Sequence, residues 1–214
     1  MAQVPTGTLF SVATTFGSNI TVTAVTNASP AVCTATAHGL SNGDVVEITS
    51  GWGRLNRRVF EVVSIDANSF SLTNSNTSST SHFPPGTGTG TVREVTAWTQ
   101  LSKVMAPSTS GGEPKTVTYK FLESDVEYSI NDGFTATSMT MEFDDDDTTA
   151  GYTAMRTLTD AQTDTVLKML MRSGARTYLP CTVAMNDVPR LQDGQINRIN
   201  AQFNGNNRHT RYAA

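Results

Sequence analysis

The sequence predicts a mainly β protein of the α+β class, in which strands dominate and one helical region flanks them. Many short segments alternate apolar with polar residues, as strands with one buried face do. Only 16% of the 214 residues are charged, against about 25% in typical soluble domains. Thr, Ser, Asn and Gly are plentiful, and they favour short strands and turns over long helices.

The segment from residue 18 to residue 72 is predicted to form about five short strands. The turn sequences Asn42-Gly43-Asp44 and Asp66-Ala67-Asn68 separate some of them. Strands this short close most naturally into a small barrel or sandwich. The expected strands are residues 20–25, 31–36, 45–49, 59–65 and 70–72.

Residues 73–91 are predicted to be a loop or linker, because they are rich in Ser, Thr, Asn and Gly and poor in apolar side chains. The Gly-Thr-Gly-Thr-Gly run at 86–90 lacks the spacing and the following helix that a phosphate cradle needs. We therefore expect no phosphate site there.

Strand patterning resumes at residues 92–101, 115–121 and 134–143. Between the first two lies residues 102–114, which hold several Pro, Ser and Gly residues and little core material. This segment is predicted to be a long loop, and loops of such length in compact domains are usually functional or disordered.

Residues 148–173 are predicted to form a helical region that is broken or kinked near Leu158. Apolar residues recur at helical spacing on either side of that point, and Gly174 ends the pattern. Strands at 176–185 and 195–203 follow, and the polar residues 204–214 are expected to be a tail. The two apolar stripes are Tyr152, Met155 and Leu158, then Val166, Leu167 and Leu170.

Four consecutive aspartates directly precede the helical region: Asp144, Asp145, Asp146 and Asp147. Carboxylates favour the positive end of the helix dipole and can cap its free N–H groups, so we expect them to cap this helix. A calcium site is the alternative, but the EF-hand spacing with its Gly and distal Glu is absent.

The sequence predicts no enzyme, cofactor or metal centre. HExxH does not occur, and the histidines His38, His82 and His209 are widely spaced; His38 is expected to close a turn before Gly39. Cys33 and Cys181 belong to no metal-binding cluster, so buried free thiols are expected, with a disulfide as the alternative. Trp52 and Trp98 are expected to lie in the core or an interface.

Net charge is uneven along the chain. Residues 93–147 contain four basic and eleven acidic residues, whereas residues 148–214 contain eight basic and four acidic ones. If these regions occupy different faces, copies of the chain could stack head to tail; accidental segregation on a solvated surface is the alternative. The cluster Arg54, Arg57 and Arg58 has no interleaved aromatics and the pI is near 5.3, so nucleic-acid binding is not expected.

Several segments resemble a known family in their order and texture. They are VREVTAW at 92–98, SGGE at 110–113, VTYKFLE at 117–123 and the aspartate run that leads to Gly151 and Tyr152. Together they resemble the major tail (tail tube) protein of long-tailed, non-contractile bacteriophages of the siphovirus type. The resemblance covers the N-terminal arm and residues 92–214.

The intervening segment resembles a small β module that is found inserted in phage virion proteins. Its marks are TATAHGLSNGDVV at 34–46, LN at 55–56, FEV at 60–62 and NSFSL at 68–72. That module is similar in fold to the first catalytic-cysteine half-domain of ubiquitin-activating enzymes. No ubiquitin chemistry is implied, since Cys33 falls on a strand without an activating environment. Arg57 stands where a small turn residue is expected.

The resemblance implies a tail-tube β-sandwich flanked by a helix. Six copies would form a ring, and rings would stack into the tube that carries DNA into the host. It implies an arm at 1–16, an inserted domain at 17–91 on the outer surface and the tube domain at 92–214. Implied partners are further copies, the tape-measure, tail-tip and tail-terminator proteins, and double-stranded DNA that passes without specific binding.

We expect the arm and the 102–114 loop to contact neighbouring copies. The acidic residues Glu123, Asp125 and Glu127 are expected to line the channel, where they would repel DNA. The alternative function is a virion-surface protein whose inserted module binds a host surface or carbohydrate. With neither a signal peptide nor a membrane span in the sequence, synthesis in the host cytoplasm is expected. The expected contact residues are Val4, Leu9, Phe10, Lys103, Val104, Met105, Pro107, Gly111, Gly112 and Glu113.

Overall fold

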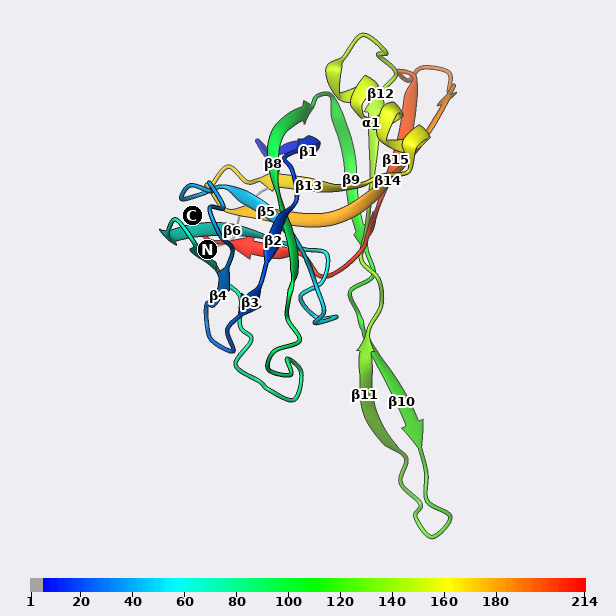
Figure 1. Cartoon of the computed structure of the whole chain (residues 1–214). Coiled ribbons are helices and arrows are strands. Elements are labelled where there is room, and N and C mark those ends of the chain that lie inside the picture. Colours follow the sequence, from blue (N-terminus) through cyan, green and yellow to red (C-terminus); the bar gives the residue numbers. More distant parts are fainter. Residues whose placement is uncertain (1–5) are drawn as a thin grey trace.

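The computed structural model describes residues 6–214 and confirms a mainly β fold with one helix in that range (Figure 1). Most predicted strands are found within a few residues of their expected positions. The elements are β1 (Leu9–Phe16), β2 (Ile20–Val22), β3 (Ala24–Val25), β4 (Ala31–Thr34), β5 (Val45–Ser50), β6 (Arg58–Asp66), β7 (Ser69–Leu72), β8 (Gly90–Leu101), β9 (Val104–Ser110), β10 (Pro114–Tyr119), β11 (Tyr128–Phe134), β12 (Ser138–Asp144), α1 (Ala150–Ala161), β13 (Asp164–Leu170), β14 (Arg176–Arg190), β15 (Arg198–Gly205) and β16 (Thr210–Tyr212).

One antiparallel sheet runs through most of the molecule in the order β3-β4-β7-β6-β5-β8-β1-β13-β14-β15-β12-β9, with β2 pairing β8 and β16 pairing β14. Strand β8 joins the two halves of this sheet. Its first residues pair with β5 and β2, and its last residues pair with β1. A twelve-residue strand is long enough to serve both halves because each residue advances about 3.4 Å.

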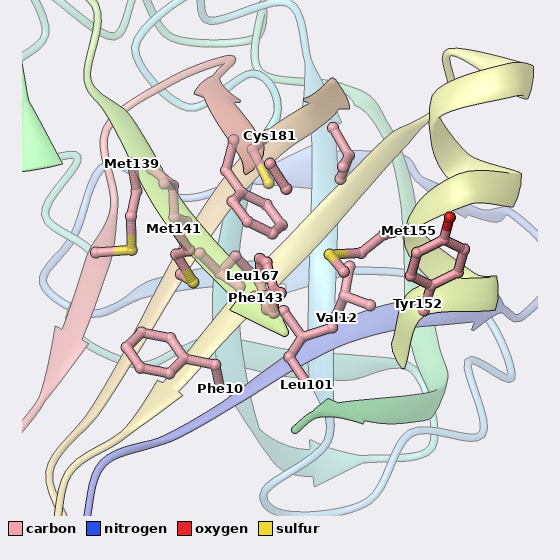
Figure 2. Close-up of a cluster of buried hydrophobic side chains, with 14 of the residues drawn as sticks. Phe10, Val12, Leu101, Met139, Met141, Phe143, Tyr152, Met155, Leu167 and Cys181 are labelled. Atoms are coloured by element: carbon pink, nitrogen blue, oxygen red, sulfur yellow. The ribbon is translucent and has the colours of Figure 1, made fainter. Parts of the chain in front are cut away.

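Buried side chains form three clusters along this sheet. One lies among β2 to β8 and includes Trp52, Phe60 and Phe70. A second lies beneath α1, where Met155 packs near Leu167, as Figure 2 shows. The third fills the junction between them. The junction cluster consists of Ala13, Val45, Val59, Val95, Val166, Tyr178 and Tyr212.

The β10–β11 hairpin forms a separate two-stranded sheet and projects away from the body (Figure 1). Every residue of both strands is exposed. The helix α1 and the β14–β15 connection lie at the opposite end of the molecule.

The prediction of a helix was wrong for the second half of residues 148–173. Helix α1 ends at Ala161, where Gln162 takes a left-handed conformation, and residues 164–170 form strand β13 between β1 and β14. An apolar run as short as Val166 and Leu167 fits a helix stripe or a buried strand equally well by periodicity. Residues 164–170 form a strand because they are buried between the neighbouring strands β1 and β14.

The aspartate run does not supply the helix cap. Thr149 is the N-cap, its Oγ1 accepting a hydrogen bond from the Tyr152 N–H, and the first turn holds no acidic residue. The aspartates end too early in the chain. Asp146 instead organises the preceding turn by accepting hydrogen bonds from the backbone N–H and the hydroxyl of Thr148.

Three segments predicted to be irregular contain strands. Residues 9–16 of the arm form β1, which is central in the sheet with Val12 and Ala13 fully buried. Most of the 102–114 loop is β9, which pairs with β12 despite Pro107 because it is an edge strand. Part of the tail is β16, and the strand predicted at 134–143 is divided between the end of β11 and β12.

Arg57 adopts a positive φ of 58°, in the left-handed region that small turn residues favour. Its guanidinium forms an ion pair with Asp164 at 2.9 Å, which links this turn to β13. An arginine at this turn position, where a small residue was expected, is therefore accommodated by a contact between the two halves of the sheet.

Candidate functional site

The titratable groups of residues 6–214 form no recognisable catalytic or metal centre: no group of three His, Cys, Asp or Glu side chains is placed to hold a metal ion. Cys33 and Cys181 are free and buried, and burial raises the pKa of each thiol to about 12. Little thiolate exists at neutral pH under those conditions, so neither cysteine is an activated nucleophile.

His38 closes a turn, as predicted. The Leu40 N–H donates to Nδ1 at 3.0 Å, so Nε2 carries the hydrogen and donates to the Asp66 carbonyl oxygen at 2.9 Å. Trp52 is only 2% exposed, and its indole N–H donates to the Pro84 carbonyl oxygen at 2.9 Å. Because Trp52 is buried, it offers no platform for a carbohydrate ring, and the alternative binding function loses the aromatic residue on which it rested.

The most unusual surface is the apolar side of the β10–β11 hairpin and its tip. Tyr119 stacks on Tyr128 with 5.5 Å between ring centroids, and Phe121 meets Tyr119 edge to face at 5.4 Å. None of these rings is covered by the body of the protein, and Leu122 is fully exposed. The exposed apolar residues from β10 to β11 are Val117, Tyr119, Phe121, Leu122, Val126, Tyr128, Ile130 and Phe134.

The hairpin is anchored at a tight base. The backbone N–H of Thr135 donates to the Glu113 carbonyl oxygen at 2.9 Å, and the Gly112 N–H donates to the Thr135 carbonyl oxygen. Gly111 has a φ of +78°, and a Cβ at this position would lie 1.9 Å from the Ala136 carbonyl oxygen. Of the expected contact residues, Gly111, Gly112 and Glu113 therefore form the root of the hairpin, where only glycine fits at 111.

The remaining expected contact residues are scattered. Val4 lies outside the described residues, Leu9 is exposed, and Phe10 is buried in the core beneath α1 and so is not available to a neighbour. Lys103 is paired with Asp144 and Asp146, at 3.0 and 2.7 Å. On β9, Val104 and Met105 are half-buried, and Pro107 is exposed.

The three acidic residues expected in a channel lie at the far end of the hairpin. Glu123, Asp125 and Glu127 are all exposed in the connection between β10 and β11. This connection lies at the far end of the hairpin, well away from the main sheet (Figure 1).

A cleft of about 630 Å³ lies at the base of the hairpin. Its walls come from four parts of the chain: the turn after β5 with the start of β6, the segment between β7 and β8, the two ends of the hairpin, and the segment between β15 and β16. Sequence reasoning missed this cleft, because its basic residues are distant in the chain; only the cluster of arginines at 54–58 pointed to it. The basic side chains that line it are Arg54, Arg58, Arg208 and His209.

Comparison with known proteins gives one match. A family model described as phage tail tube protein matches residues 50–214, from the last residue of β5 to the C-terminus. No curated protein matches the chain. Within residues 6–214, the only helix is too short to cross a membrane.

Proposed function

We propose, from the premise that the chain belongs to the phage tail tube protein family, that its copies close into rings of six and that the rings stack into the tube of a non-contractile, siphovirus-type tail. The tube then conducts DNA into the host. The tape-measure protein would occupy the tube during assembly, and the tail-tip and terminator proteins would bind its two ends.

The projecting hairpin carries this proposal. Eight large apolar side chains stand exposed on the two strands of this isolated hairpin and on the connection between them, although a lone hairpin is only marginally stable in water. Exposed apolar surface of this extent is typical of an interaction site. A neighbouring copy that covers the hairpin would bury those side chains and stabilise its conformation.

The edge of the sheet supports ring formation. Within the described residues, β9 is the terminal strand of the sheet and pairs only with β12. A free edge presents unpaired N–H and C=O groups that can pair with another chain. Closing copies into a ring satisfies such edges without leaving one open, and it puts residues such as Pro107 and Ser108 at the junction between subunits.

The purified protein is expected to form rings or hollow tubes of uniform diameter as its concentration rises. Apolar burial and edge pairing both favour association, and open stacking lets it continue. Negative-stain electron microscopy with sedimentation, followed over days, measures this. A chain that stays monomeric at all salt concentrations, with any tag removed, would overturn the proposed function.

We further propose that residues 17–91 are an inserted domain on the outside of the tube, similar in fold to the half-domain named above. Strands β2 to β7 surround a buried cluster of their own, which supports a separate unit. Strand β8, whose Val92 belongs to the same cluster, would be the strand on which the inserted domain was built.

Glu123, Asp125 and Glu127 are proposed to face the channel at the hairpin tip. Replacing all three with lysine is expected to slow or block DNA delivery, because cationic side chains would hold the passing phosphates. Tube assembly should be nearly normal, since all three side chains are exposed. Infectivity of phage that carry the triple variant, measured beside tail length by microscopy, tests this; normal infectivity would show that these residues face elsewhere.

A further inference from the structure

Apart from the acidic hairpin tip, two clusters of opposite charge lie in different parts of the molecule: a basic cleft at the hairpin base and aspartates around the start of α1. The cleft at the hairpin base is lined by Arg54, Arg58, Arg208 and His209, and no Asp or Glu among residues 6–214 lines it. Burial and the charges of Arg208, Arg58 and Arg211 lower the pKa of His209, which shows how closely the cations gather. Such a concentration of like charge is costly unless an anion enters the cleft.

Arg58 is the most constrained of these cations. Its side chain is half-buried, its guanidinium lies over the Phe60 ring at 4.7 Å, and one amino group donates to the Thr210 hydroxyl at 3.1 Å. Its Nε atom is buried without a hydrogen-bond partner. Arg208 lies over the Phe134 ring at 4.8 Å, so the hairpin base holds a second cation at the cleft. These arginines are held in place without carboxylate partners.

Several aspartates lie close together at the other end of the molecule, near α1. Burial raises the pKa of the Tyr152 hydroxyl, the carboxylates of Asp187, Asp145 and Asp147 raise it further, and Arg156 lowers it. Three carboxylates and one cation therefore lie near this hydroxyl, so acidic charge is in excess at the start of α1. Asp147 and Asp187 are exposed. The cations Arg190 and Arg198 at this end are both paired with Glu142.

We propose that the cleft at the hairpin base is a docking site for a second copy of this chain, and that it receives the aspartates at the start of α1 from that copy. The inference rests on the proposed stacking of rings and names the residues that would meet. Arg54, Arg58 and Arg208 form the receiving side, and Asp147 and Asp187 form the inserted side.

The head-to-tail direction of stacking favours the aspartates at the start of α1, and not the acidic hairpin tip, as the segment that enters the cleft. The cleft is lined by both ends of the hairpin. The hairpin projects from the end of the body that lies opposite α1 (Figure 1). In a head-to-tail stack, like ends cannot meet, so the cleft faces the α1 end of the next copy. The inferred contact also makes the 17–91 segment part of the ring junction, because it supplies Arg54 and Arg58.

The test is an exchange of charges across the proposed contact. The double variant Arg54→Glu/Arg208→Glu is expected to raise the lowest concentration that gives tubes by about tenfold or more, since attraction becomes repulsion. Asp147→Arg/Asp187→Arg is expected to do the same. Combining all four substitutions should restore assembly to near the wild-type concentration. Sedimentation and negative-stain microscopy measure this at low salt, where such contacts are strongest.

Arg172→Glu is the matched control, because Arg172 is exposed in the turn between β13 and β14, outside the cleft, and should assemble normally. Circular dichroism melts confirm that each variant is folded. If wild-type protein forms tubes and the cleft variant forms them at the same concentration, the inference is wrong while the proposed function stands. The inference is also wrong if the double variants lose assembly and the fourfold variant does not regain it. It is wrong, too, if the cleft variant loses DNA binding but assembles as wild type does. If the wild-type chain never assembles, both this inference and the proposed function are wrong.

Discussion

Removal of the β10–β11 hairpin will give a folded monomer that no longer polymerises. The backbones of Glu113 and Thr135 are hydrogen-bonded at 2.9 Å, so an Asn-Gly turn can join them in place of residues 114–134. All residues of both deleted strands are exposed, so the free energy of unfolding should change by no more than about 1 kcal/mol. Sedimentation velocity and thermal melts measure the two effects separately.

A substitution variant guards against an artefact of the deletion. Replacing Tyr119, Phe121 and Tyr128 with serine keeps the hairpin length but removes its aromatic cluster, and it should also abolish tubes. Thr116→Ser and Thr118→Ser on the same strand are the matched control and should assemble normally. Tubes of normal diameter and length from the deletion variant would contradict the role given to the hairpin.

The choice of residues for this deletion comes from the structure. A deletion of residues 102–114, which the sequence alone would suggest, removes β9 and its pairing with β12. It also removes Lys103, which binds two aspartates before α1. Such a variant would lose assembly through misfolding, and it could not separate folding from polymerisation.

Trp52→Ala will destabilise the protein by about 3–5 kcal/mol. The indole is buried, packs edge to face against Phe83 and donates to both the Pro84 carbonyl oxygen and the Thr87 hydroxyl. Gly88 lies against its ring so closely that a Cβ there would be 2.8 Å away. Residues 83–88 are therefore packed against this side chain, and they should become sensitive to proteases in the variant.

Denaturant unfolding measures the loss, and limited proteolysis locates it. The stability of Trp52→Phe should lie between those of wild type and Trp52→Ala, because the variant keeps most of the ring but loses the hydrogen bonds that the indole N–H donates. Trp98→Phe is the control, since Trp98 is only half-buried and donates no hydrogen bond within the described structure. If Trp52→Ala is as stable as wild type but loses binding to a glycan, the carbohydrate function must be reconsidered.

Much of the fold could be predicted because the strands alternate so regularly. In β12, Met139, Met141 and Phe143 are buried and the residues between them are not, which is the pattern that the sequence shows. The approach fails where one short run fits two structures: Val166 and Leu167 are apolar in either a helix or a strand. Only the neighbours β1 and β14 decide between them, and these come from distant parts of the chain.

The assembly surfaces were harder to predict than the fold. Alternation in β10 suggests a strand with a buried face, yet Val117 and Tyr119 are exposed in the single chain. The neighbouring copy that we propose would cover them. Strand β11 escaped prediction since Asn131, Asp132 and Gly133 interrupt its pattern. The basic cleft combines residues more than one hundred positions apart, and no local pattern reveals such a site.

Strand β8 also has a mechanical consequence. Strands β2 to β7 and the rest of the sheet are joined through one unbroken strand whose hydrogen bonds run to β5 and to β1. A force that pulls along this strand loads many of those bonds in shear at once, so they must break together. In the proposed tube, bending is therefore expected between subunits, with each subunit moving as a rigid block.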